Sequence, residues 1–313
     1  MRDKIAVTRR GIIRSLAALG AGAGLAGHAR ASPPPAVNSC AFLALGDWGM
    51  EGNVGQRAVA SALGQEAVAV GARFVISTGD NFYRTGVSGF DDPRWKTSFE
   101  DVYVAPALSI PWYPVLGNHD RRGNAMAEIA YSSVSDRWCM PGPYYRRREI
   151  LADGAFADFF FLDTEMINRE TSEYADVLSG DDDDDQMNWL ALELAASRAR
   201  WKVVIGHHPV FSGGQHGDTA AMKRTVRPLL ERYGVHAYVC GHDHCLQDIV
   251  VQGIHYLTTG AGSSTKPAAS VAGTKFVASR LGFLAAEVEP DALSFRFVDA
   301  DLRELYRATL SGS

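Results

Sequence analysis

Short apolar runs of strand length recur along the chain, and a polar turn closes each one. Six of them are "CAFLALGD" (40–47), "RFVISTGD" (73–80), "IPWYPVLGNHD" (110–120), "ADFFFLDT" (157–164), "WKVVIGHHP" (201–209) and "HAYVCGHDH" (236–244). Their β-branched and aromatic content and their bounding turn residues predict buried strands.

Helical periodicity fills the stretches between these runs. Residues 54–70, about Gln186 to Ala199, and 219–232 are predicted helices; in the second, Met187, Leu190 and Leu194 fall on one face. The last seventy residues carry further strand-like runs, "DIVVQ", "IHYLTT", "FLAAEVE" and "LSFRFVD". The alternation predicts an α/β fold without internal repeats.

The early strands end in the same kind of residue pair, a Gly followed by Asp, Asn or His. Residues just beyond the carboxyl ends of strands in an α/β sheet line the crevice where ligands bind. Taken singly, each polar residue is explained by a turn or a structural contact. Together they are two carboxylates, a phenol, an amide and three imidazoles: Asp47, Asp80, Tyr83, Asn118, His207, His242 and His244.

Seven donors are too many for one tetrahedral zinc and suit two six-coordinate ions. Two ions roughly 3.5–4 Å apart form the clamp used by phosphate-ester hydrolases. One ligand must then bridge them. Asp80 is the candidate, since a carboxylate can give one oxygen to each metal.

The five motifs that carry these residues, "GDWG", "GDNFY", "GNHD", "GHHP" and "GHDH", resemble in sequence and order those of the calcineurin-like metallophosphoesterases. Tyr83 in "GDNFY" narrows the resemblance to the purple acid phosphatases. "FEDVY", "RPLLERYGVHAYVCGHDH" and "GAGS" extend the similarity to the small tartrate-resistant type over residues 41–290. The resemblance implies a four-layer αββα sandwich of two mixed sheets. It assigns Asp47, Asp80, Tyr83 and His244 to a first metal, and Asp80, Asn118, His207 and His242 to a second.

The metals follow from the donors and the resemblance. A free phenol titrates near 10, so an ionised Tyr83 in acid needs a strong Lewis acid such as Fe(III), and phenolate-to-iron charge transfer would colour the protein. The second ion would be divalent Fe, Zn or Mn. The family's second-sphere histidines, which contact the phosphate or the leaving group, match His119 and His216; the acid beside the latter is replaced by Gln215.

The resemblance implies an acid phosphatase that hydrolyses phosphate monoesters with a metal-bound hydroxide as nucleophile. A phosphodiesterase or nucleotidase of the same superfamily is the alternative, and a redox-active iron protein is a third. A formal net charge of -5 and a pI near 6.0 give no general reason to bind nucleic acid or an anionic membrane. The expected partner is a small phosphate ester, and the oligomeric state stays open.

The first residues have the form of an export signal. Arg9 and Arg10 precede an uncharged run from Ser15 to Gly27, and "ARA" follows at 29–31. Residues 1–31 are interpreted as a twin-arginine signal peptide, 32–40 as a leader and 41–313 as the catalytic domain. The uncharged run is shorter than the roughly 20 residues of a spanning helix. We therefore expect a periplasmic or secreted protein, free of the membrane after cleavage.

Four cysteines allow zero, one or two disulfides, and the pairing stays open: Cys40, Cys139, Cys240 and Cys245. The disulfide of the animal-type enzymes has no counterpart, because Met166 and Met222 stand near its positions.

Residues beside the proposed ligands have simpler expected roles. Trp48 and Phe82 are expected to wall the crevice, and the run Asp181 to Asp185 to be a solvated acidic loop before a helix. Asp243 is expected to accept a turn hydrogen bond or to support a ligand. Structural roles are expected for Asp120, His208, His236 and His255, and an exposed strand for Arg146 to Arg148.

Overall fold

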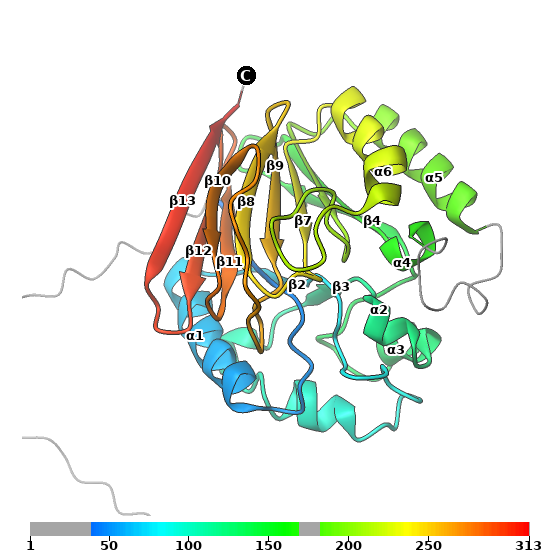
Figure 1. Ribbon diagram of the computed structural model, residues 1–313, viewed down its shortest axis with the longest axis vertical. Coiled ribbons are helices and arrows are strands. Elements are labelled where there is room, and N and C mark those ends of the chain that lie inside the picture. Colours follow the sequence, from blue (N-terminus) through cyan, green and yellow to red (C-terminus); the bar gives the residue numbers. More distant parts are fainter. Residues whose placement is uncertain (1–38, 169–181, 313) are drawn as a thin grey trace, which may run out of the picture. The chain divides into compact units, whose positions relative to one another are not determined.

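Two mixed β-sheets form the centre of the computed structural model, which describes residues 39–168 and 182–312 (Figure 1). Within these residues, the six-stranded sheet has the order β13 (Glu304–Ser311), β12 (Ala292–Asp299), β11 (Gly282–Val288), β1 (Cys40–Leu45), β2 (Phe74–Ser77), β3 (Trp112–Pro114). The seven-stranded sheet has the order β10 (Thr274–Ala278), β8 (Leu246–Val251), β9 (Ile254–Thr259), β7 (Ala237–Cys240), β6 (Trp201–Ile205), β5 (Phe156–Phe161), β4 (Tyr145–Ile150).

All the predicted strands are confirmed, including the one through Arg146 to Arg148, which is β4. Its predicted exposure holds for Arg148 alone, because Arg146 and Arg147 are partly buried in ion pairs with Asp158 and Glu149. Two strands were not anticipated, β10 and β13. Both lie at sheet edges and are only partly buried, so their sequences lack a continuous apolar signal.

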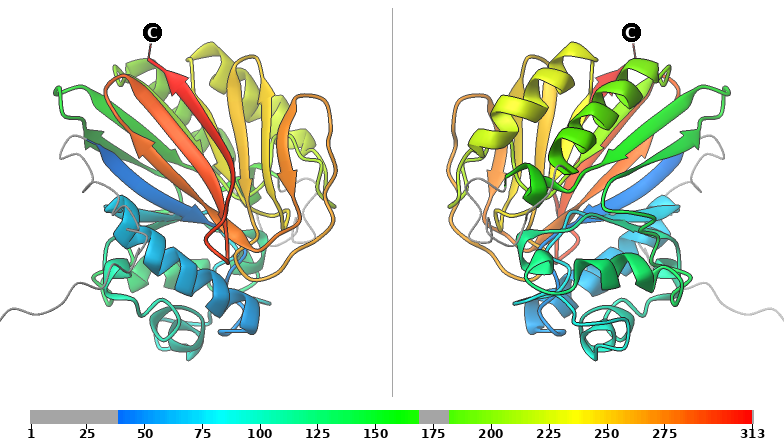
Figure 2. Two further views of the ribbon diagram at one scale, coloured as in Figure 1. Left: turned by 90° about the vertical axis from the view of Figure 1, so that its left-hand side faces the viewer. Right: turned by 90° about the vertical axis from the view of Figure 1, so that its right-hand side faces the viewer.

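The two sheets pack face to face (Figure 2). Phe42 of β1 meets Phe159 of β5 edge to face, with ring centroids 5.4 Å apart. The next residue on β5, Phe160, points to the other face and joins the core that includes Leu190 of α5 and Val226 of α6. The seven-stranded sheet is thus covered on both faces, which explains its nearly continuous apolar strands.

Helices complete the outer layers and confirm the predicted four-layer αββα sandwich. The helix α1 (Val54–Val70) packs against β1 and β11, and α5 (Asp182–Ala196) and α6 (Ala220–Arg232) cover the seven-stranded sheet. Asn53 caps α1 by accepting the amide of Gln56, and Gly71 ends it with a left-handed φ of 61°. The bounds of α1 are those predicted.

The start of α5 corrects one expectation. The sequence predicts a solvated loop for the acidic run and a helix that begins near Gln186, but α5 begins at Asp182. Carboxylates in the first turn of a helix are favoured by its dipole, so the run is compatible with helix as well as with loop. Asp181 lies outside the described residues.

Short helical turns occupy the connections between β2 and β3, between β3 and β4, and after β5. They are η1 (Trp95–Glu100, a π-helical turn), η2 (Pro106–Leu108), α2 (Asn118–Arg121), α3 (Ala125–Tyr131) and α4 (Thr164–Ile167). Around η1 an aromatic cluster forms, in which Trp48 and Phe82 lie 5.8 Å apart and both have 0% exposure. The expectation that these two rings wall an open crevice is wrong, because they pack beneath the loops that carry the predicted ligands.

The four cysteines are free thiols, three buried and Cys139 partly exposed. Met166 and Met222 are buried on α4 and α6, which pack together. In the part of the chain that the structure describes, no helix is long and apolar enough to cross a membrane. The predicted signal peptide, residues 1–31, lies outside the described residues.

Candidate metal centre

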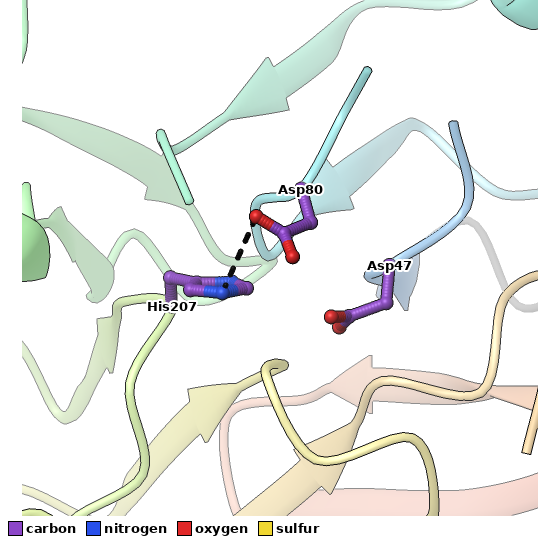
Figure 3. Close-up of side chains that lie close together, drawn as sticks. All are labelled: Asp47, Asp80 and His207. Atoms are coloured by element: carbon purple, nitrogen blue, oxygen red, sulfur yellow. Dashed lines mark ion pairs between the residues drawn. The ribbon is translucent and has the colours of Figure 1, made fainter. Parts of the chain in front are cut away.

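The predicted ligands come from both sheets. Asp47, Asp80 and Asn118 follow the neighbouring strands β1, β2 and β3, whereas His207 and His242 follow the neighbouring strands β6 and β7 of the other sheet. Their polar atoms meet where the two sets of strand ends converge. Figure 3 shows Asp47 and Asp80 facing His207 across this point.

Tight turns aim these side chains inward. Asp47, Asp80 and His242 have left-handed φ values of 59°, 52° and 68°, which non-glycine residues seldom adopt. Glycines directly before the predicted ligands, such as Gly117 before Asn118 and Gly241 before His242, are needed for close approach. A Cβ on Gly117 would lie 2.2 Å from Asp80 Oδ1, and one on Gly241 would lie 2.4 Å from Asp47 Oδ2. The recurrent Gly-polar pairs of the sequence therefore have a steric cause.

Three ligands of the proposed first site are in mutual contact. The Tyr83 hydroxyl lies 3.0 Å from Asp47 Oδ1 and 3.1 Å from His244 Nε2. His244 Nε2 is 3.5 Å from Asp47 Oδ1.

The second group forms a similar triangle. Asn118 Oδ1 lies 3.1 Å from His207 Nε2 and 3.2 Å from His242 Nδ1, and the two imidazole nitrogens are 3.2 Å apart. Asp80 Oδ1 is 3.5 Å from His207 Nε2, and potential ligand atoms of Asp47, Asp80 and His207 lie within 4.8 Å of one another. Asp80 thus lies between the two groups, where a bridging ligand would have to be.

The electrostatics of the cluster fit a bound cation. Asp47 and Asp80 have 0% and 2% exposure, and no Lys or Arg of the described residues pairs with either. Burial and the neighbouring Asp80 charge raise the pKa of Asp47 well above the usual value of an aspartate. Burial likewise raises the pKa of Tyr83 well above the usual value of a tyrosine. Buried carboxylates side by side are costly unless neutralised, and multivalent cations reverse this penalty. The residues therefore fit a pair of metal ions.

Hydrogen bonds orient two of the three imidazoles. His207 Nδ1 lies 2.9 Å from the Thr78 carbonyl oxygen, so it donates and leaves Nε2 for a metal. His244 Nδ1 lies 2.7 Å from Ser264 Oγ, and its Nε2 faces Asp47. Burial lowers the pKa of His244 to about 4, which keeps the ring neutral in mild acid.

Ser264 was missed by the sequence interpretation. It follows β9 in "GAGSS", where Ser263 stands before it, so it lacks the Gly-polar pair that identified the ligands; its place in a glycine-rich turn after a strand end is the signal that could have found it. The neighbouring Ser263 hydroxyl donates to the Asp47 carbonyl oxygen, so this loop supports two of the predicted ligands.

The two histidines predicted to contact the phosphate or the leaving group lie beside different groups of ligands, His119 beside the first group and His216 beside the second. His119 packs against Tyr83 with ring centroids 4.4 Å apart; its Nδ1 lies 2.6 Å from the Arg84 carbonyl oxygen and its Nε2 lies 3.9 Å from Asp80 Oδ2. The exposed His216 lies beside His242, with ring centroids 4.2 Å apart.

Buried polar neighbours hold the ligand loops. Asp120 accepts the amides of Gly117, Asn81 and Phe82 at 2.8, 3.1 and 3.0 Å, which ties the loop after β2 to the loop after β3. His208 Nδ1 lies 2.9 Å from Thr164 Oγ1 and its Nε2 lies 3.3 Å from Glu165, while its ring packs against that of His242 with centroids 4.6 Å apart.

Away from the site, the other two histidines of the described residues make structural contacts. His236 Nδ1 accepts the Lys202 amide, and His255 Nδ1 lies 3.0 Å from both carboxylate oxygens of Asp248.

Comparison with known proteins gives a consistent picture. The family model of the calcineurin-like phosphoesterases matches residues 41–246. The chain is 36% identical to mouse tartrate-resistant acid phosphatase type 5 over 304 residues, covering 89% of this chain and 91% of that protein. It is 38% identical over 252 residues to Arabidopsis thaliana purple acid phosphatase 17, covering 74% and 70% of the two chains.

Among solved structures, GAP50, the anchor in the inner membrane complex of Plasmodium, superposes with a TM-score of 0.78 at 26% identity, covering 88% of this chain and 90% of that one. A protein described as an anchor shares the fold, so function must be argued from the site residues.

Proposed function

The chain belongs to the purple acid phosphatases of the calcineurin-like phosphoesterase family, and on that basis we propose that it is an acid phosphatase acting on phosphate monoesters. One observation carries the proposal. Two triangles of potential ligands, Asp47, Tyr83 and His244 on one side and Asn118, His207 and His242 on the other, flank the buried Asp80.

The donors suggest unequal metals. Asp47, Asp80 and Tyr83 supply three anionic oxygens beside one imidazole, a hard and charge-rich set that suits Fe(III). The other group supplies an amide oxygen and two neutral imidazoles beside the shared carboxylate, which suffices for divalent Fe, Zn or Mn. When bound, such a pair lowers the pKa of a coordinated water and neutralises the charge of phosphate oxygens.

The chain's own residues would protonate the leaving group and orient the phosphate. In hydrolysis a bond forms between phosphorus and the water oxygen, the bond from phosphorus to the ester oxygen breaks, and the departing alkoxide takes up a proton. We assign that proton to the imidazole of His216, which is exposed beside the second group. His119 Nδ1 donates to the Arg84 carbonyl oxygen, so its Nε2 is left to accept a hydrogen bond, which the hydroxyl of a phosphate monoester monoanion can donate.

Metal analysis with a visible spectrum, repeated on Tyr83→Phe, tests the metal assignment. We expect about one iron and about one further metal per chain in the unsubstituted protein. The substitution keeps the ring but removes the phenol oxygen, so the absorption band should disappear. Tyr131→Phe is the matched control, because its hydroxyl donates to Glu100 away from the cluster of ligands. A band that survives in Tyr83→Phe contradicts the assignment.

Rates on p-nitrophenyl phosphate and on its bis ester in mild acid test the substrate class. Faster hydrolysis of the monoester is expected. A strong preference for the diester would favour a phosphodiesterase, and peroxide consumption without hydrolysis of either ester would favour a redox-active iron protein.

The predicted signal peptide leads to a proposal on location. Cleavage after "ARA" would release a chain beginning near Ser32 into the periplasm or medium. Amino-terminal sequencing of the exported protein checks this, and an intact amino terminus would contradict it.

A further inference from the structure

The loop of residues 212–217, "SGGQHG", carries His216 and has no regular secondary structure of its own. It is held instead by the turn that follows β7. Asp243 Oδ1 accepts the His216 amide at 2.9 Å, and Oδ2 accepts the hydroxyl of Ser212. The Ser212 oxygen in turn accepts the amide of Gly214 at 2.9 Å. One carboxylate therefore fixes both ends of the loop.

The contact is buried and closely packed. Asp243 has 1% exposure and Ser212 has 4%. A Cβ on Gly214 would lie 2.3 Å from the Asp243 carboxyl carbon, so only glycine permits this approach. Gln247, which is fully buried, adds a third anchor by accepting the Gly213 amide at 3.0 Å.

The same turn also carries ligands. Asp243 stands between His242 and His244 in the sequence, while its carboxylate points to the 212–217 loop. The imidazole that this loop presents lies over His242, with centroids 4.2 Å apart. The position of His216 relative to the ligands is thus set within a single turn.

We propose that Asp243 is a positioning residue, which holds His216 at the distance from the metal pair where it protonates the leaving group. This rests on the proposed phosphatase function. Hydrogen bonds that include an ionised acceptor are shorter and stronger than neutral ones, so a carboxylate is well suited to fix a glycine-rich loop.

The test compares Asp243→Ala with esters of good and poor leaving groups. General acid catalysis contributes most when the leaving group is a poor one, so kcat on phenyl phosphate should fall by about a hundredfold. On p-nitrophenyl phosphate, whose leaving group departs without help, the fall should be under about fivefold. Asp243→Asn keeps an oxygen that accepts the His216 amide, and should restore most of the phenyl phosphate rate.

Two further variants separate positioning from damage to the fold. Ser212→Ala removes one partner of the carboxylate and should produce the same pattern at smaller amplitude. Asp248→Asn is the matched control, a buried aspartate that bonds His255 and Tyr306 away from the loop, and it should leave the ratio of the two rates unchanged. Equal losses on both esters in Asp243→Ala and Ser212→Ala would overturn the proposal.

Hydrogen exchange gives a readout that needs no activity. In Asp243→Ala, amide exchange in the peptide that covers residues 212–217 should accelerate by about tenfold, the factor expected when a hydrogen bond to a charged group is removed. Unchanged exchange would overturn the proposal even if the protein hydrolysed no ester. Absence of hydrolysis in the unsubstituted protein with accelerated exchange in the variant would instead refute the proposed function and support the loop contact.

Discussion

Replacing Ser264 by alanine should weaken iron binding selectively. Its hydroxyl lies 2.7 Å from His244 Nδ1 and fixes the ring whose Nε2 faces Asp47. The corresponding partner of His207 Nδ1 is the backbone carbonyl oxygen of Thr78, which a side-chain substitution does not remove, so the same test cannot be made at His207.

The magnitude follows from the single hydrogen bond that the substitution removes. Ser264→Ala deletes this outer partner of His244 and leaves all seven proposed ligands in place. Partners of this kind change metal affinity by about 10–100-fold, which is about 1.4–2.8 kcal/mol. The loss should fall on iron, because the hydrogen bond of Ser264 is to His244 of the first group, whereas the hydrogen bonds of the second group within the described residues do not involve Ser264.

Competition against a chelator series, with both metals measured in the retained protein, gives the affinities. The visible band of the iron site should weaken in parallel. Ser294→Ala serves as the control, because that hydroxyl is bonded to Thr309 on an exposed strand pair. Unchanged iron affinity, or equal loss of both metals, would refute the orienting role of Ser264.

Three more outcomes are expected. Asp120→Ala leaves three backbone amides without their acceptor and should lower the free energy of unfolding by at least about 3 kcal/mol in urea denaturation, whereas a loss below about 1 kcal/mol would contradict the contacts. Burial lowers the pKa of His244 in the metal-free site to about 4, so the ring is neutral above that pH and protonated below it; binding of iron to the metal-free protein should weaken as the pH falls below about 4, and equal binding at about pH 5 and about pH 3 would count against this ligand. Burial raises the pKa of all four thiols, to about 12 for Cys40 and Cys245, and only Cys139 is partly exposed; Cys139 alone should therefore react with a thiol reagent at mild alkaline pH, and all four should react after denaturation without reductant.

The turns that carry the proposed ligands hold three residues in an unfavourable backbone conformation, which bears on how metal binding affects stability. Left-handed backbone at Asp47, Asp80 and His242 costs about 1–3 kcal/mol each and persists because the surrounding structure holds it. Asp47 and Asp80 each accept a backbone amide, but no Lys or Arg of the described residues neutralises either carboxylate. Bound metal should therefore stabilise the folded chain.

The local sequence pattern predicts where most helices and strands lie, but it does not predict which residues at their ends are buried. The caps Asn53 and Gly71 and the apolar content between them specify α1 to the residue. Trp48 and Phe82 follow strand ends like the ligands do, yet they are buried in an aromatic cluster built largely from η1 and its neighbours. Whether a residue beyond a strand faces the site or the core depends on what packs there.

The sequence alone determined which residue types close each strand, because hydrophobic period and turn chemistry are properties of a few neighbouring positions. It thereby identified the candidate ligands and their order. The tertiary structure decided that β1 pairs with β11 as well as with β2, that the ligands divide between two sheets, and that Ser264 and Asp243 support His244 and His216. Such contacts join residues far apart in the chain, and their partners are selected by the packing of whole sheets, which no local pattern encodes.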